Sequence, residues 1–123
     1  MEYQLTIVER SAWLHARATG ANEPKNLLRF LRDAYAACIE RDRTALLLET
    51  RFSGPSLATS TIFGVVTERS TDGARLRKVA YVNGNDDSSP EKAKFAETVA
   101  INRGVNVRLF HDVAAAEGWL SEP

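Results

Sequence analysis

The beginning of the chain alternates between apolar and polar side chains, which is the period of a β-strand with one face in water. Tyr3, Leu5 and Ile7 are apolar, and the residues between them are polar. A second short strand is expected at residues 12–18, before residues 19–22 break the pattern with glycine and asparagine. The chain therefore opens with an expected hairpin.

A longer period indicates helices in the rest of the chain. Apolar residues recur at steps of three and four through residues 24–40, which predicts an amphipathic helix. Similar spacing predicts a second helix at residues 57–69, with a turn at residues 71–73. Ser89 and Asp112 are expected to cap two further helices, because their side chains can accept from backbone N–H groups at a helix start.

Two continuous apolar runs, at residues 45–48 and 79–82, are typical of central strands that are covered on both faces. A last strand is expected at residues 105–110. The order of elements, ββαβαβαβα, predicts an α/β fold with an open, mostly parallel sheet, right-handed crossovers and one antiparallel edge. A closed eightfold barrel would need about twice this length.

The composition fits a single domain over residues 1–123. A chain that is 44% hydrophobic can bury one core without disulfides, metal ions or cofactors. Cys38 lies on the apolar side of the first helix, so we expect a small buried hydrophobe rather than a reactive thiol. The N-terminus does not resemble a signal peptide, and no apolar stretch approaches the ~20 residues that cross a bilayer. A cytoplasmic monomer or homodimer is expected.

The charges balance, with 16 Lys and Arg against 16 Asp and Glu. No net field therefore attracts nucleic acid or an anionic membrane, and we expect neither a nucleic-acid partner nor membrane insertion. A short basic run at Arg75, Arg77 and Lys78 is interpreted as a solvated surface. A protein partner remains possible.

Residues that could carry catalysis are few and scattered. Ser53 or Ser56 could act as a nucleophile with His111 and Asp112 in a small hydrolase or phosphotransferase. No Gly-x-Ser-x-Gly elbow and no phosphate-binding glycine loop is present. His15 is expected at the surface or at an edge, and one cysteine with two histidines matches no zinc site. A non-catalytic protein is favoured, and the enzyme is kept as the alternative.

In open α/β sheets, ligands bind outside the carboxyl ends of the parallel strands. Residues 50–60 are the longest segment expected there, and their hydroxyls lie near a helix start, where N–H groups favour an anion or a phosphorylated side chain. Two phenylalanines nearby could anchor a partner, or could instead pack under the helix. The candidate binding residues are Phe52, Ser53, Ser56, Thr59, Ser60 and Phe63.

Four parts of the sequence together resemble the STAS family, the sulphate-transporter and anti-sigma-factor-antagonist domains, and in particular its uncharacterised stand-alone bacterial members. They are the order of elements, the strand at 45–49 with its Ser/Thr-rich loop and Gly64-Val65-Val66 helix, the helix end at 95–104, and residues 107–120. The resemblance covers nearly the whole chain and implies a STAS-like α/β domain.

In signalling members of that family, a partner kinase phosphorylates a serine or threonine at the start of the second helix, which switches partner binding. Gly64-Val65-Val66 brings Thr59 and Ser60 to the corresponding region, with Ala58 where those members have an aspartate. The resemblance implies a regulatory or adaptor module that binds a protein partner or a small ligand at the second helix and the loop before it.

Overall fold

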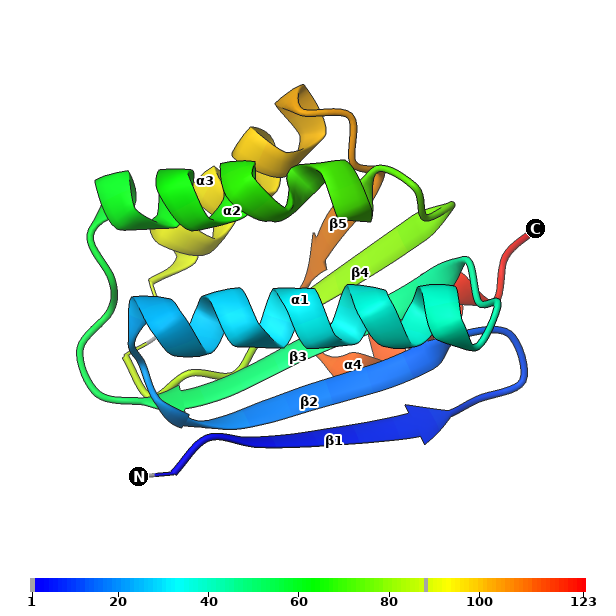
Figure 1. Ribbon diagram of the computed structural model, residues 1–123, viewed down its shortest axis with the longest axis horizontal. Coiled ribbons are helices and arrows are strands. Elements are labelled where there is room, and N and C mark those ends of the chain that lie inside the picture. Colours follow the sequence, from blue (N-terminus) through cyan, green and yellow to red (C-terminus); the bar gives the residue numbers. More distant parts are fainter. Residues whose placement is uncertain (1, 88) are drawn as a thin grey trace.

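Figure 1 shows a computed structural model of the chain, in which residues 2–87 and 89–123 are described. The helices and strands follow the order ββαβαβαβα, as the sequence predicts. They are β1 (Gln4–Glu9), β2 (Leu14–Ala21), α1 (Pro24–Glu40), β3 (Ala45–Ser53), α2 (Thr59–Gly73), β4 (Lys78–Asn83), α3 (Pro90–Asn102), β5 (Val107–Phe110) and α4 (Val113–Leu120).

The strands form one sheet in the order β1-β2-β3-β4-β5. β1 is antiparallel to β2, and each of the other neighbouring pairs is parallel. β3 is therefore the middle strand and β4 is also interior, which confirms that the two apolar runs are central. The open, mostly parallel sheet with one antiparallel edge is confirmed as well.

The two faces of the sheet carry different layers (Figure 1). α1, α2 and α3 lie on one face, where Phe30 and Leu46 belong to the larger core. α4 lies on the other face, where Leu47 and Trp119 belong to a smaller core. Because side chains alternate along a strand, consecutive leucines of β3 supply both cores.

The helix boundaries with strong local signals are confirmed. α1 spans Pro24–Glu40, as its apolar spacing predicts. The Ser89 hydroxyl accepts from the backbone N–H of Lys92 at the start of α3, and the Asp112 carboxylate accepts from that of Ala115 at the start of α4. These caps satisfy donors that the first turn of a helix cannot pair internally.

Three strands, β2, β3 and β4, are longer than predicted and β5 is shorter. β2 spans Leu14–Ala21 instead of residues 12–18, and β3 continues to Ser53, whereas β5 begins only at Val107. The ends of β2 and β3 pair with each other, and β2 passes through Gly20 at a φ of +137°. A Cβ atom there would lie 2.9 Å from the Cα of Tyr3, so the close approach of the residue before β1 requires glycine.

The second helix is displaced from its predicted position at residues 57–69. α2 spans Thr59–Gly73, so the residues predicted as a turn form its last turn. Gly73 is buried, and a Cβ atom on it would lie 3.1 Å from the ring of Tyr35. Glycine at this position therefore allows α1 and α2 to approach closely. From the sequence alone, the same glycine indicated a turn.

Lys78 corrects the interpretation of the basic run as a solvated surface. Arg75 and Arg77 are exposed, but Lys78 is only 8% exposed. Its Nζ donates to the carbonyl oxygens of Trp119 and Glu122 at 2.7 and 2.8 Å. The ammonium group thus pairs with carbonyls at the end of α4, where a positive charge also matches the helix dipole.

Within residues 2–87 and 89–123, none of the helices has the length and apolar character that spanning a bilayer requires. The same residues include no cluster of three or more His, Cys, Asp or Glu side chains that could hold a metal ion.

We expect a chelator and a reductant to leave thermal unfolding unchanged. Cys38 is fully buried, and burial raises the pKa of its thiol to about 11, so the reactive thiolate is disfavoured. Melting curves recorded by circular dichroism with and without each reagent should coincide. A fall of many degrees with the chelator would contradict this expectation and reveal a metal site.

Candidate functional site

The loop between β3 and α2 is held in place by side chains from three other segments. Asn22, just after β2, donates from Nδ2 to the carbonyl oxygen of Pro55 at 3.0 Å. Asp87 accepts from the backbone N–H of Ser56 at 2.8 Å, and Lys92 donates from Nζ to the Ser56 hydroxyl at 2.8 Å. The loop therefore has a defined shape, although its residues are small and polar.

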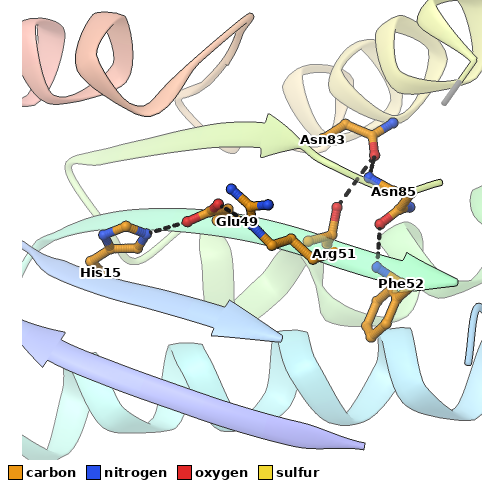
Figure 2. Close-up of polar contacts among 7 residues, drawn as sticks. His15, Glu49, Arg51, Phe52, Asn83 and Asn85 are labelled. Atoms are coloured by element: carbon orange, nitrogen blue, oxygen red, sulfur yellow. Dashed lines mark hydrogen bonds and ion pairs between the residues drawn. The ribbon is translucent and has the colours of Figure 1, made fainter. Parts of the chain in front are cut away.

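Two asparagines beside the end of β4 extend β3 beyond its apolar part (Figure 2). The Asn85 side-chain oxygen accepts from the backbone N–H of Phe52 at 2.7 Å. The Asn83 side-chain oxygen accepts from the Thr50 hydroxyl at 3.4 Å and from the backbone N–H of Asn85 at 3.1 Å. These bonds satisfy polar groups at the carboxyl edge of the sheet and keep β3 extended as far as Ser53.

A cavity of about 50 Å³ lies between these loops and the helices beside them. Pockets for small molecules typically measure about 300–1,000 Å³, so this one is far too small for a metabolite. Its lining mixes polar and apolar groups and includes Asn22, Thr50, Ser56, Tyr81, Asn83 and Lys92.

Phe52 does not have the exposed position that a partner anchor needs. It is 1% exposed, and its ring meets that of Phe30 edge to face, with centroids 6.4 Å apart. Phe52 therefore packs under the helices, the alternative that the sequence left open. Ser53 is half-buried at the last position of β3, and the half-buried Ser56 hydroxyl accepts from Lys92.

The remaining predicted residues lie on the surface at the start of α2. Thr59 and Ser60 are exposed, and the Phe63 side chain is 45% exposed. The guanidinium of Arg103 lies over the Phe63 ring, 5.8 Å from its centroid. Ala58 precedes the helix without a side-chain cap, and the first turn has no acidic residue. The first-turn N–H groups therefore lack intrahelical partners and face no nearby carboxylate of their own helix.

The residues of the alternative enzyme do not converge. His111 and Asp112 follow β5, which is separated from β3 by β4. Neighbouring strands lie about 4.8 Å apart, so Ser53 is about 10 Å from the β5 line across the sheet alone. The Asp112 carboxylate caps α4 by accepting from Ala115, and Ser56 bonds Lys92. These four residues therefore do not bring a nucleophile, a base and an acid within hydrogen-bonding reach of one another.

The sequence did not predict a row of hydrogen-bonded polar side chains on the sheet face that carries α4 (Figure 2). His15 Nε2 lies 2.7 Å from Glu49 Oε1, and Arg51 Nε donates to Glu49 Oε2 at 2.6 Å. Glu49 is 3% exposed in the central strand. His15 is half-buried on the interior strand β2, which corrects the expectation of a surface or edge histidine.

The charge of Glu49 is set by these two partners. Burial acts to raise the pKa of its carboxyl, but the hydrogen bonds from Arg51 and His15 outweigh burial and lower the pKa below its usual value. Glu49 is thus ionised at neutral pH and can only accept hydrogen bonds. His15 Nε2 therefore carries the proton that it shares with Glu49.

A weak signal for this arrangement is present in the sequence. Leu14, Ala16 and Ala18 are apolar and buried, whereas His15 and Arg17 alternate with them. This period of two predicts that His15 and Arg17 share one face. It does not predict that Glu49 lies beside them, because that depends on the pairing of β2 with β3.

The known proteins similar to this chain are found by structure rather than by sequence. No protein-family model matches the chain, and the search of curated proteins finds no match. The solved structures include an uncharacterized protein from the DUF3478 family with a SpoIIAA-like fold, from Shewanella loihica PV-4. The two chains are 13% identical with a TM-score of 0.58, over 96% of this chain and 93% of the other. The chain therefore has a SpoIIAA-like, that is STAS-like, α/β fold, as its sequence resemblance predicts.

Proposed function

We propose that the protein is a non-catalytic regulatory or adaptor module that binds a protein partner through α2 and the loop before it. The observation that carries this proposal is the exposure of Phe63 beside two exposed hydroxyl residues, Thr59 and Ser60, at a helix start. Aromatic side chains on a surface are frequent anchors of protein interfaces. The STAS-like fold is consistent with such a role, and a cytoplasmic location agrees with the single free thiol of Cys38.

The geometry of the loop favours a protein partner over a small ligand. The cavity beside the loop has a volume of only about 50 Å³, and the lysine and aspartate that line it already bind Ser56. The same contacts hold the loop in one shape, which lowers the entropy that ordering it on binding would cost. A preorganised surface beside so small a cavity suits another protein.

The exposed hydroxyls suggest how binding could be regulated. A phosphate on Thr59 or Ser60 would lie near unpaired N–H groups and the positive end of the α2 dipole, without an acidic residue in the first turn to oppose it. It would also add negative charge beside Phe63. Phosphorylation of either residue would therefore change the partner-binding surface without a need to unfold the helix.

We expect Phe63→Ala to weaken partner binding about tenfold or more, the usual effect of truncating a central interface anchor. The partner is recovered by affinity capture from the cell of origin with quantitative mass spectrometry, and its Kd is then measured with purified proteins. Thr59→Glu and Ser60→Glu, which mimic the added charge, should change the same Kd. Each variant should melt at the temperature of the unmodified protein.

Ile39→Ala is the matched control for Phe63→Ala. Ile39 is also an exposed apolar residue, 46% exposed, but it lies near the end of α1. Its truncation should leave the Kd unchanged. An interface at α2 would be contradicted if all three α2 variants bound the partner as tightly as the unmodified protein. It would also be contradicted if Ile39→Ala weakened binding as much as Phe63→Ala.

A further inference from the structure

The sheet face that carries α4 is open over β1 and β2. On this face Thr6 lies opposite Arg17, and Val8 lies opposite His15. Together with Arg10, which follows β1, these residues line a hollow of about 150 Å³. Val8 is 40% exposed and Thr6, Arg10 and Arg17 are exposed, so solvent reaches the hollow freely. It is separate from the α2 surface and shares no residue with it.

The hollow has positive charge that the described part of the chain leaves uncompensated. Neither the Arg10 nor the Arg17 guanidinium forms a hydrogen bond or ion pair with residues 2–87 or 89–123, and the lining includes no acidic side chain. The nearest carboxylate of the central strand, Glu49, is already paired with His15 and Arg51. Two guanidinium groups are therefore free to bind an anion.

The backbone around the hollow is held in place. The Arg10 N–H donates to the Trp13 carbonyl oxygen at 2.8 Å, and the Arg10 carbonyl oxygen accepts from the Arg43 guanidinium at 2.8 Å. These bonds shape the turn between β1 and β2 and bring a third cationic side chain to it. The backbone of the site thus lies on a strand pair and on a turn that hydrogen bonds hold.

His15 adds a directed polar group. Its Nε2 faces Glu49, and Figure 2 shows the other ring nitrogen, Nδ1, turned away from that carboxylate. Because Nε2 carries the proton, Nδ1 of the neutral ring can accept from the P–OH of a singly protonated phosphate, and the protonated ring can donate to a phosphate oxygen. The Thr6 hydroxyl is a further donor on the same side.

We propose that this hollow binds a phosphate group, as inorganic phosphate or as a small phosphomonoester. A phosphate group has more oxygens than a carboxylate, arranged tetrahedrally instead of in one plane, and can bond both guanidiniums, the imidazole and the hydroxyl at once. A volume of about 150 Å³ accommodates such a group, since by the same measure one water needs only about 10–15 Å³.

The test is a titration followed by ¹H–¹⁵N NMR at constant ionic strength, with inorganic phosphate, phenyl phosphate and chloride as probes. We expect saturable shifts for phosphate and phenyl phosphate at residues 6–10 and 15–17, including the Nε–H signals of Arg10 and Arg17. Arg10→Gln and Arg17→Gln should each weaken binding about tenfold, the loss of one charge-assisted hydrogen bond. Both residues are exposed, so their variants should melt normally.

Arg75→Gln is the matched control, because Arg75 is an exposed arginine outside the hollow. It should leave the affinity unchanged. The proposal is overturned if phosphate gives no saturable shifts, if chloride gives the same shifts, or if Arg75→Gln weakens binding as much as the other variants. Vesicles that contain phosphatidic acid separate a lipid headgroup from a free phosphate. Binding to vesicles that depends on Arg10 and Arg17, without binding of soluble phosphate, would also overturn it.

Discussion

Leu47→Ala is expected to lower the free energy of unfolding by about 2–5 kcal/mol, the range measured for truncation of fully buried leucines. Leu47 is 0% exposed on β3, the middle strand of the sheet. Its side chain packs in the smaller core with Trp13 and Trp119, under the only helix described on that face. A cavity left there cannot collapse easily, because the large rings around it are also buried.

Urea denaturation of the unmodified protein and of Leu47→Ala, followed by circular dichroism, measures this loss. Ile39→Ala is the control, since its side chain is 46% exposed and its truncation should cost less than about 1 kcal/mol. If Leu47→Ala lowered the free energy of unfolding by less than about half a kcal/mol, as a surface substitution does, β3 would not be a central strand covered on both faces.

Glu49→Gln is expected to lower the free energy of unfolding by about 2–3 kcal/mol at pH 7, because hydrogen bonds to a charged group contribute about 1.5–3 kcal/mol each. The glutamine keeps the size of the side chain but loses the charge that both His15 and Arg51 contact. The expected loss is below that of two full bonds, because the Arg51 side chain is 54% exposed and can turn to water.

The effect of Glu49→Gln should depend on pH in one direction. Hydrogen bonds lower the pKa of Glu49 in the folded protein below its usual value of 4.5, so the ionised carboxylate stabilises the fold. That contribution is fully present above about pH 4.5 and is lost as the pH falls through the folded pKa. The difference between the two proteins should therefore shrink in acid.

Glu40→Gln, an exposed position at the end of α1, is the control and should show neither effect. Denaturation midpoints measured from pH 7 down to the acid limit of the native state give the comparison. A difference between Glu49→Gln and the unmodified protein that grows in acid would mean that the carboxyl is neutral in the folded state.

The two phenylalanines of the candidate site separate what a sequence pattern can predict from what it cannot. Both Phe52 and Phe63 lie in a Ser/Thr-rich stretch, and nothing local distinguishes them. Phe52 is buried because β3 continues beyond its apolar run and turns that ring toward Phe30, 22 residues earlier in the sequence. Phe63 stays at the surface because it lies on the outer side of α2.

The sequence by itself determined the elements whose cause is local. The apolar stripe of α1, the caps at Ser89 and Asp112 and the apolar runs of β3 and β4 each depend on residues within a few positions of one another, and their order implies the parallel sheet. Strand ends were decided by tertiary contacts. β3 reaches Ser53 because β2 and Asn85, which follows β4, supply hydrogen-bond partners there.

Only the tertiary structure decided which polar groups meet. His15 and Glu49 are 34 residues apart, and strand register alone brings them to 2.7 Å. The hollow that Arg10 and Arg17 line forms because α4 leaves β1 and β2 uncovered, although the overall charge of the chain is zero. A balanced composition says nothing about how charges are distributed in space, since that distribution follows from pairing and layering that no single segment encodes.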